Sequence, residues 1–422
     1  MSAFTLRPAA AADLPRIVNL SRLAFAPLRT EVEVEQDWFD GSLDVPGHQF
    51  FLAVEATTGE VVGSYAQLAL QLSLTSQLFP TMGIAAVAVA PHWRGQGIAR
   101  CMMEHAVKMA RDRQIALMML YPFQHGFYRK LGWAWVGRSH QYRVSTRHLP
   151  LYPERTRMLP YDPGRDADGL RASYDRACLQ QNGWLHRPDW QWTGRLKPAK
   201  GKEIYCYREA ADIEGYLILQ LTQLQNPRST LAVVVQEWVA LTARAYRGLL
   251  GFLAGWRDQV PTVIWNTYPD DPFPSLLQEQ QRDPSLITPP FEFGLTHAFG
   301  EIGGGFMWRL ADIPAAFQRR PVQPTPPFQI GFQITDPVPD PTLPTPYTLT
   351  VEFINGQMQS LNQPATTVLH LSTSHLTQLF SGFRRATELL WTGEIELEGD
   401  VTLLSYLDAA WHTRAPFCWD FF

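Results

Sequence analysis

The sequence predicts an α/β and α+β protein with three consecutive units, of which the second is a degenerate copy of the first. Three observations lead to this prediction. An apolar strand runs through a glycine-containing turn into a helix near residue 95. A similar order of strands and helices returns after residue 150. From Gly303 the pattern changes to alternating strands followed by amphipathic helices, which is typical of an α+β unit.

Length and composition limit the class of protein. The chain has 422 residues, which suggests about three domains, and apolar residues make up 45% of it. A net charge of −4 argues against a nucleic-acid partner. The sequence shows no signal peptide, and no apolar run approaches the ~20 residues of a membrane span. We therefore expect a cytoplasmic protein that has no membrane partner.

The cysteines do not have the spacing of a metal site. The chain contains four of them, at Cys101, Cys178, Cys206 and Cys418, with no CxxC pair. This pattern favours reduced thiols, and we expect no bound metal.

The first unit, residues 1–150, alternates between strands and helices. We expect one helix between Asp13 and Ala24, and another at 97–113 with apolar residues every three or four positions. A short helix with a glycine stop is expected near Gly126–Trp133. The expected strands are 4–6, 50–55, 61–70, 87–90 and 116–120.

The turn before the helix at 97–113 carries the strongest functional signal. We call Arg94-Gly95-Gln96-Gly97-Ile98-Ala99 the glycine turn. Its two glycines have no β-carbon, so a ligand can approach the backbone closely. The free N–H groups of the first helical turn and the helix dipole favour an anion there. The spacing is not the G-x-x-x-x-G-K-[ST] of a nucleoside-triphosphate loop. It is not G-x-G-x-x-G either, because position 100 is Arg. Taken alone, it would also suit an ordinary helix start.

The glycine turn resembles the R/Q-x-x-G-x-G/A signature of GNAT acetyltransferases, which hold the pyrophosphate of acetyl-CoA. Phe127-Tyr128-Arg129-Lys130-Leu131-Gly132-Trp133 resembles the aromatic helix F-Y-x-K-x-G-[FYW] that follows the fifth strand of that family. The order of elements over residues 1–150 is similar as well. The resemblance implies a catalytic GNAT domain with acetyl-CoA as co-substrate.

Residues 151–300 are expected to form a degenerate GNAT-like domain. The strand at 204–209, with the turn at Asp212 after it, echoes the strand and turn of the first unit. A strand at 231–235 then leads to a helix at 241–254, where the first unit has its glycine turn. The glycine pair is missing there, and a β-carbon at those positions blocks close approach. We expect this copy to bind no coenzyme A.

Residues 301–422 are expected to form the α+β domain. Strands are predicted at 328–334, 349–353 and 368–371, with helices near 374–380 and 403–407. The three-part plan resembles the Eis (enhanced intracellular survival) family of GNAT N-acetyltransferases, whose C-terminal domain is similar to sterol carrier protein. This resemblance spans the whole chain and implies a homo-oligomer, a hexamer.

Acetyl transfer from a thioester to an amine needs a held cofactor, a polarised carbonyl, a base for the amine and an acid for the thiolate. The backbone of Val87, Ala88 and Val89 can pair with the pantetheine arm and polarise the carbonyl, or it can be plain core strand.

Tyr128 is the candidate acid, because its pKa of about 10 is near the thiol's value of about 8.5. The family resemblance implies the same role. His125 competes for it, and Tyr128 could instead only pack on pantetheine.

The C-terminus is unusually aromatic, ending in Trp419-Asp420-Phe421-Phe422. An end this apolar is expected to be buried with its α-carboxylate, and burial makes a carboxylate a stronger base. In the Eis family the terminal carboxylate serves as the base for the amine, and Phe422 matches that position. Where the family has an acid before its last residue, this chain has Phe421, with Asp420 as a substitute. The other interpretation is a hydrophobic anchor with its carboxylate at a rim.

An acidic run lies between the first helix and the second strand, where GNAT domains build the acceptor wall. It contains Glu31, Glu33, Glu35, Asp37 and Asp40. Such a run suits a polycationic amine by charge and cation–π contact, although most of it also fits a solvated acidic helix. We expect Phe25 and Trp38 to line the acceptor pocket.

These observations favour an acetyl-CoA-dependent N-acetyltransferase acting on a small-molecule amine such as an aminoglycoside or a polyamine. One alternative is acetylation of protein lysines or N-termini. Another is a non-catalytic lipid-binding or scaffolding protein that uses its C-terminal domain. A hydrophobic tunnel through residues 303–422 would favour the last of these.

Overall fold

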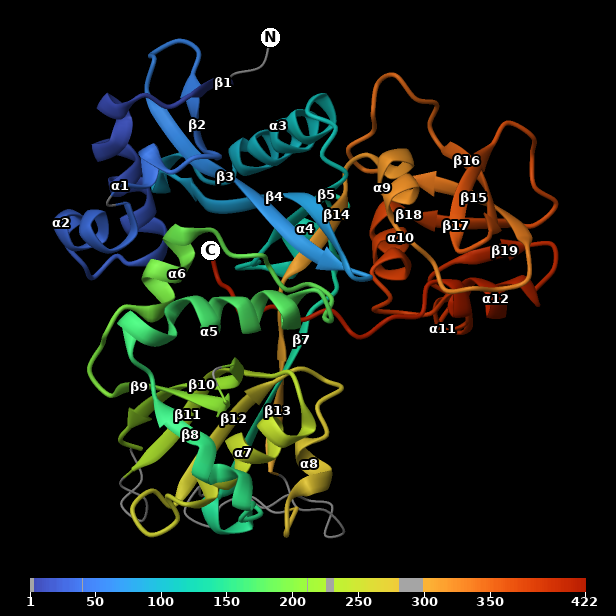
Figure 1. Ribbon diagram of the computed structural model, residues 1–422. Helices are drawn as coiled ribbons and strands as arrows, with labels where there is room; N and C mark the ends of the chain where they lie inside the picture. Colours follow the sequence, from blue (N-terminus) through green and yellow to red (C-terminus); the bar gives the residue numbers. More distant parts are fainter. Residues whose placement is uncertain (1–3, 40, 211, 225–230, 281–298) are drawn as a thin grey trace, which may run out of the picture. The chain divides into compact units, whose positions relative to one another are not determined.

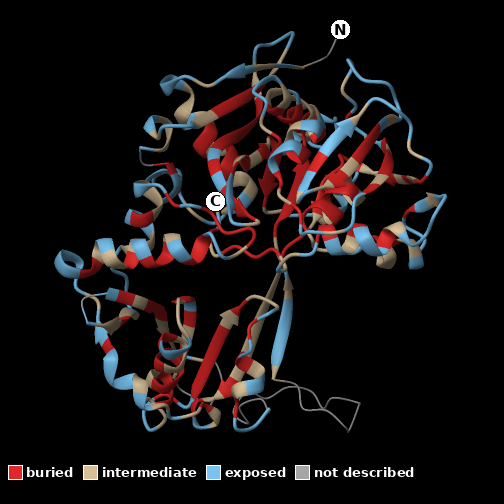
Figure 2. Ribbon diagram, turned by 45° about the vertical axis from the view of Figure 1, so that its right-hand side comes forward, coloured by how far each residue is buried: buried red, intermediate tan, exposed pale blue. Residues whose placement is uncertain are grey.

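The structure is a computed structural model that describes residues 4–39, 41–210, 212–224, 231–280 and 299–422. The described strands form three sheets, with helices packed against them (Figure 1). The chain divides into two compact units. The first contains Met1–Val136, Phe306–Thr413 and Asp420–Phe422, and the second contains Gly137–Gly305 and Arg414–Trp419. Buried residues follow the central strands of the sheets (Figure 2).

The first sheet of the first unit has the strand order β1-β2-β3-β4-β5-β14-β6. Its strands are β1 (Phe4–Pro8), β2 (His48–Glu55), β3 (Val61–Leu74), β4 (Gln77–Val89), β5 (Leu117–Leu120), β14 (Met307–Leu310) and β6 (Ala134–Trp135). β1 to β4 are antiparallel neighbours, whereas β5 lies parallel to β4. The apolar stripe of α3 (Ile98–Asp112) explains its place, because Met102 and Ala106 are buried against Met82 and Ile84 of β4. α1 (Leu14–Phe25) also contacts β3 and β4.

The second unit repeats this plan in a sheet of order β13-β7-β12-β11-β10-β9-β8. Its strands are β7 (Arg138–Ser145), β8 (Met158–Pro160), β9 (Lys202–Glu209), β10 (Asp212–Thr222), β11 (Ala232–Ala240), β12 (Thr262–Thr267) and β13 (Gly300–Gly304). Its helices are α5 (Pro163–Cys178), α6 (Asp189–Leu196), α7 (Ala243–Ala254) and α8 (Phe273–Leu276). Antiparallel β9, β10 and β11 are followed by α7 and by β12, which is parallel to β11. This is the order of β2, β3, β4, α3 and β5 in the first unit.

The chain passes from the first sheet to the second between β6 and β7, and it returns between β13 and β14. β7 comes from the range 1–150, yet it pairs with β12 of the second sheet. β14 comes from the range 301–422, yet it pairs with β5 and β6 of the first sheet. Hydrogen bonding across these strands, rather than position along the sequence, therefore defines the sheets.

A third sheet, of order β17-β16-β15-β18-β19, belongs to the first unit. Its strands are β15 (Phe328–Thr335), β16 (Tyr347–Ile354), β17 (Gln357–Leu361), β18 (Val368–Ser372) and β19 (Glu396–Glu398). The accompanying helices are α9 (Ile313–Arg319), α10 (Thr373–Phe380), α11 (Ala386–Trp391) and α12 (Leu403–Ala410). Aromatic rings pack in its interior: Phe332 stacks on Trp411, and Phe317 and Phe353 contact the Trp411 ring edge-on.

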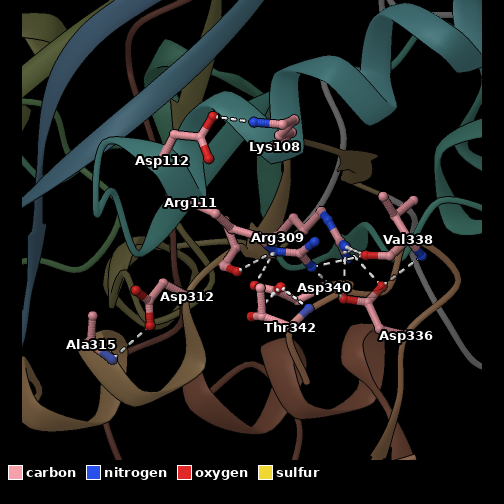
Figure 3. A network of polar contacts seen from close by, with 11 residues as sticks. Lys108, Arg111, Asp112, Arg309, Asp312, Ala315, Asp336, Val338, Asp340 and Thr342 are labelled. Carbon is pink, nitrogen blue, oxygen red and sulfur yellow. Dashed lines mark hydrogen bonds and ion pairs between the residues drawn. The ribbon is translucent and has the colours of Figure 1, made fainter. Parts of the chain in front are cut away.

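An ion cluster joins this third sheet to the first one (Figure 3). Arg309 of β14 is fully buried and donates from Nη2 to both carboxylate oxygens of Asp336, at 2.8 and 2.9 Å. Arg111 of α3 donates to the same carboxylate at 3.0 Å and to the carbonyl oxygen of Val338 at 2.8 Å. Burial lowers the pKa of Arg309, while the adjacent Asp336 raises it. A charge this deep in the protein depends on its partner.

Within the described ranges, no helix combines the length and the apolar character needed to cross a bilayer.

Candidate active site

The two central strands of the first sheet separate where the predicted cofactor site begins. β4 and β5 pair from Thr81–Leu117 to Ile84–Leu120, where β5 ends. Beyond Ile84, β4 has a bulge: its pairing with β3 shifts in register, and Ala86 adopts a φ of 49°. In the described part of the chain, no strand pairs with Val87–Val89 on the β5 side. This edge can take a peptide-like arm as an added strand.

The glycine turn follows β4 and opens α3. Gly95 and Gly97 have φ values of 80° and 83°, a backbone conformation that glycine adopts without strain. A β-carbon built at either position would meet nothing within 4 Å, so the space around the turn is open. Gly97 is the N-cap of α3, and no side chain caps that helix. The N–H groups of its first turn are therefore available to an anionic ligand.

The other residues of the glycine turn divide by exposure. Arg94 and Gln96 are exposed, so both side chains can reach a bound anion. Ile98 is buried in the core cluster around Met102 and contributes only its backbone N–H to this surface. Ala99 is partly buried against the same cluster. The glycine turn is thus held to the core by Ile98 and Ala99, while Arg94 and Gln96 are exposed to a ligand.

The corresponding helix of the second unit is capped differently. Thr242 precedes α7, and its hydroxyl accepts a hydrogen bond from the Ala245 N–H. Thr242 also donates to Glu214 at 2.7 Å, which places a carboxylate beside this helix start. A bound phosphate would have to displace the cap and would meet that negative charge. The start of α7 is therefore less open to an anion than the start of α3, and the absence of coenzyme A binding by the second copy stays a prediction.

Tyr128 lies in α4 (His125–Arg129), which follows β5. Its ring is buried among Phe123, Phe127 and Trp133, with centroid distances of 5.8, 5.0 and 6.2 Å. Burial raises the pKa of Tyr128, so the phenol keeps its proton at neutral pH. No group of the described residues hydrogen-bonds to its hydroxyl, which leaves the proton available to a ligand.

His125 suits the acid role less well. Burial lowers the pKa of His125, and the positive charge of Arg129 adds to the effect. A histidine with a lowered pKa is mostly neutral at pH 7, so it has no imidazolium proton to give.

The end of the chain lies at the same two strands. Residues 420–422, which we call the chain end, belong to the first unit. The Tyr121 hydroxyl donates to the carbonyl oxygen of Asp420 at 2.6 Å. The Tyr121 ring lies 4.9 Å from that of Phe421 and 5.6 Å from that of Phe422, between centroids. Tyr121 directly follows β5, so it holds the chain end beside the point where β4 and β5 separate.

Gly83 of β4 makes room for the last residue. A β-carbon there would come within 3.2 Å of Phe422 Cε2 and within 2.6 Å of Leu70 Cδ1. Successive residues of a strand point to opposite faces, and Met82 and Ile84 pack with α3. The Phe422 ring therefore lies on the face opposite α3. Neither Gly83 nor Tyr121 was predicted from the sequence, although an aromatic residue directly after a buried strand was a usable signal for Tyr121.

The two residues expected to line the acceptor pocket, Phe25 and Trp38, are exposed, and Trp38 is already in contact with Arg29. Phe25 ends α1, and Trp38 lies in the helical turn Glu35–Phe39; both rings are exposed. The guanidinium of Arg29 lies 5.7 Å from the centre of the Trp38 ring and pairs with Asp37. Among the described residues, no ring contact joins Phe25 or Trp38 to Tyr128 or Phe422.

Three carboxylates of the acidic run, those of Glu31, Glu33 and Asp37, are bonded locally. Glu31 of α2 (Glu31–Val34) accepts a hydrogen bond from Asn19 at 2.5 Å and lies 3.9 Å from Arg22. Glu33 accepts from both the backbone N–H and the hydroxyl of Thr30, which lowers the pKa of Glu33. Asp40, the last acid of the run, lies outside the described residues. The run is therefore mainly a set of helix caps and local ion pairs.

Comparisons with known proteins agree with this geometry. Residues 5–136 match the model of an acetyltransferase (GNAT) domain family, and residues 183–309 match a second acetyltransferase (GNAT) domain family. Residues 313–419 match the sterol carrier protein domain. The protein is thus an acyltransferase of the GNAT class with two such domains and a sterol-carrier-protein-like domain, which confirms the predicted fold class.

More particularly, the chain is a homologue of the Eis N-acetyltransferases. It is 24% identical over 373 residues to the N-acetyltransferases Eis of Mycobacterium tuberculosis and Mycobacterium bovis, covering 85% of this chain and 84% of each relative. Its fold is similar to a GCN5-related N-acetyltransferase from Anabaena variabilis, with a TM-score of 0.81, 20% identity, and 99% and 100% of the two chains covered. It is also similar to Eis1 from Mycobacterium abscessus, with a TM-score of 0.77, 19% identity and the same coverage.

Proposed function

We propose that the protein transfers the acetyl group of acetyl-CoA to a primary amine of a small-molecule acceptor, and that its first GNAT domain carries the reaction. One observation supports this above all. The uncapped start of α3, the free edge of β4 and the buried Tyr128 lie together around the point where β4 and β5 separate. A coenzyme A thioester offers a pyrophosphate, an amide-bearing arm and a leaving thiolate, which match these three features in turn.

The glycine turn would hold the pyrophosphate. The backbone N–H groups of residues 95–99 and the Arg94 guanidinium supply donors and positive charge. The pantetheine amides would pair with Val87, Ala88 and Val89, and an N–H of this edge would polarise the thioester carbonyl. The open space around Gly95 and Gly97 supports this assignment.

The proton transfers involve Tyr128 and the chain end. The Phe422 carboxylate accepts a proton from the acceptor ammonium, and the freed amine nitrogen attacks the thioester carbon. The C–N bond forms, the C–S bond breaks, and the Tyr128 hydroxyl gives its proton to the leaving sulfur. The acetylated nitrogen still carries one proton more than the amide product, and it loses this proton to water. Excluding water raises the pKa of the thiol together with that of Tyr128, so the transfer stays feasible. Proton exchange with water restores both groups.

The second candidate function, lipid binding by the third domain, has less support. Three phenylalanine rings pack around Trp411 in the interior of that domain. Acetylation of protein lysines or N-termini would use the same chemistry with a larger acceptor.

We also propose, from the likeness to the Eis family, that the protein forms a homo-oligomer, a hexamer. Light scattering would test this oligomeric state.

The test is a panel of amines incubated with the purified full chain and acetyl-CoA. Release of free thiol is followed by colour reagent, and acetylated products are identified by mass spectrometry. We expect thiol release that depends on a small amine. If acetyl-CoA binds but no amine, peptide or protein is acetylated, the proposal is wrong. If only peptides and proteins are acetylated, the small-molecule acceptor is wrong.

A further inference from the structure

The last residues of the chain are bonded on both sides of the Trp419–Asp420 peptide bond. On one side, the Tyr121 hydroxyl donates to the Asp420 carbonyl oxygen at 2.6 Å. On the other side, Nη2 of Arg195 in α6 donates to the Trp419 carbonyl oxygen at 2.8 Å. Trp419 belongs to the second unit and Asp420 to the first, so each of these bonds lies within one unit. The proposed base, the carboxylate of Phe422, follows shortly after them.

A buried ion cluster orients the guanidinium of Arg195. Its Nε lies 3.2 Å from Oε2 of Glu237 in β11. Arg187 donates to the two carboxylate oxygens of Glu237 at 2.9 and 2.7 Å, and the Tyr216 hydroxyl donates to one of them at 2.5 Å. The side chains of Arg187 and Glu237 are fully buried. A carboxylate bound in this way keeps one orientation, and it holds Arg195 where that side chain reaches Trp419.

The residues before the chain end pack into the second unit. We call residues 414–419 the tail segment, all of which belong to that unit. The Phe417 N–H donates to the carbonyl oxygen of Asn182 at 2.9 Å. The Trp419 ring lies 4.7 Å from that of Phe417 and 6.0 Å from that of Trp184, between centroids. The tail segment is therefore fixed by a backbone hydrogen bond and by ring contacts, in addition to Arg195.

The tail segment packs near the place where the central strands of the second copy separate. The backbone pairing of β11 and β12 ends at Val235 and Trp265. Beyond this point the Trp238 indole of β11 donates to the Asn266 carbonyl oxygen of β12 at 3.2 Å. The Trp419 ring lies 6.4 Å from the Trp238 ring. In the first copy the corresponding gap, between β4 and β5, is the proposed place of the pantetheine arm, whereas in the second copy side chains bridge it and the tail segment packs on them.

We infer that the second GNAT copy holds the tail segment, and that Arg195 is a positioning residue for the Phe422 carboxylate. This rests on the proposed function, in which that carboxylate is the base. Arg195 bonds to the residue directly before the chain end, so without this bond Trp419 and the residues after it gain freedom to move. A displacement of about 1 Å at a reacting group can lower a rate by up to about a hundredfold.

The test is a double-mutant cycle between Arg195→Met and a chain lengthened after Phe422 by a few Gly and Ser residues. In the unextended chain, Arg195→Met should lower kcat about tenfold and leave acetyl-CoA affinity unchanged. In the lengthened chain, which has already lost the carboxylate, the same substitution should have no further effect on kcat. Turnover is measured with the best amine of the panel, and affinity by calorimetry.

The matched control is Arg247→Met, because Arg247 also forms an ion pair within the second unit, with Glu154 at 2.7 Å. It should change kcat less than twofold in either chain. An unchanged kcat for Arg195→Met in the unextended chain, or an equal loss in both chains, would overturn this inference and leave the proposed function standing. If lengthening the chain costs no turnover, the Phe422 carboxylate is not the base, and this inference fails with that part of the proposed function.

Hydrogen–deuterium exchange followed by mass spectrometry measures the holding of the tail segment without turnover. The amides of the C-terminal peptide should exchange at least threefold faster in Arg195→Met than in the unaltered protein, because the lost bond makes local opening easier. Arg195→Lys keeps a positive charge beside Glu237, so it should lie between the two and serves if the methionine variant does not fold. Exchange at the unaltered rate in both variants would show that Arg195 does not hold the tail segment.

Discussion

At the scale of single residues, the proposed proton transfer and the position of the chain end depend on two tyrosine hydroxyl groups. Tyr128 is buried, keeps its proton because burial raises its pKa, and has no hydrogen-bond partner among the described residues. Tyr121 instead uses its hydroxyl within the protein, at 2.6 Å from the Asp420 carbonyl oxygen. Two tyrosines near one strand end thus have different expected roles, one as an acid and the other as a positioning residue.

Tyr128→Phe should lower turnover about a hundredfold and leave acetyl-CoA affinity unchanged. The substitution removes a proton donor and keeps the ring packing, and general acid catalysis typically contributes about that factor or more. Turnover is measured under conditions limited by chemistry, and affinity by calorimetry. Turnover like that of the unaltered enzyme would make Tyr128 a packing residue.

Tyr121→Phe should lower kcat about five- to tenfold, because the hydrogen bond that it removes contributes roughly 1 kcal/mol to the position of the chain end. The Phe421 and Phe422 ring contacts would remain, so Tyr121→Ala should have a larger effect. Steady-state kinetics with saturating acetyl-CoA separate kcat from KM. Equal activity of both variants and the unaltered enzyme would contradict a positioning role.

At the scale of elements, the two copies differ in how they start one helix. α3 begins after a turn with two left-handed glycines and no side-chain cap, whereas α7 begins after Thr242, which caps it. Both strands before these helices have a register shift against their neighbour, so the bulge alone does not separate a binding copy from a silent one. The difference in the helix start is the basis for proposing that coenzyme A binds the first copy and not the second.

Gly97→Trp should abolish acetyl-CoA binding, because the indole would fill the open space over the first turn of α3. The control is Gly393→Trp, since Gly393 also has a positive φ, of 71°, and open space around it, but lies in the third domain. Both variants carry the same backbone strain, and only the first should lose binding in calorimetry. Normal binding of one equivalent by Gly97→Trp would refute the assigned site.

The sequence predicted the elements that have local signals. The helix expected at 97–113 is observed as α3, and the strands expected at 328–334 and 349–353 are observed as β15 and β16. The bulge at Ala86 was not predictable, because no glycine marks it and its cause is pairing with β3. The exchange of β7 and β14 between sheets was also missed, since strand partners are decided by tertiary contacts that a local pattern does not contain.

The candidate site, like the fold, was predictable only where a short local motif marks it. The glycine turn and Tyr128 follow from short motifs that need only a few neighbouring residues. Tyr121 and Gly83 matter because they contact a chain end some 300 positions later in the sequence, as the Tyr121–Asp420 hydrogen bond shows. Such pairings carry no local signal.

At the scale of the whole molecule, the third domain is part of the structure around the proposed active site. β14 completes the first sheet, and Asp336 of the third domain binds both Arg309 and Arg111 (Figure 3). The chain end then returns to the first unit. The third domain therefore has a structural role that does not depend on any lipid.

Asp336→Ala should lower the free energy of unfolding by about 3 kcal/mol, because it leaves the Arg309 charge buried without its partner. Asp340→Ala is the matched control, since Asp340 is more exposed and lies 3.9 Å from Arg111. That control should change stability by less than about 1 kcal/mol. Urea unfolding followed by tryptophan fluorescence measures both. Equal stability of the two variants would show that the ion cluster does not anchor the third domain.

The most direct test of the central claim, that the chain end supplies the base, is to lengthen the chain by a few Gly and Ser residues after Phe422. The extension removes the α-carboxylate of Phe422, whose ring contacts Tyr121, and leaves the glycine turn untouched. Amine acetylation and acetyl-CoA binding are then measured on the same preparation, next to a protein extended at Met1. We predict that acetylation falls at least a hundredfold for the C-terminal extension alone, with acetyl-CoA affinity and the circular dichroism spectrum unchanged. Undiminished turnover with the lengthened C-terminus would contradict the account.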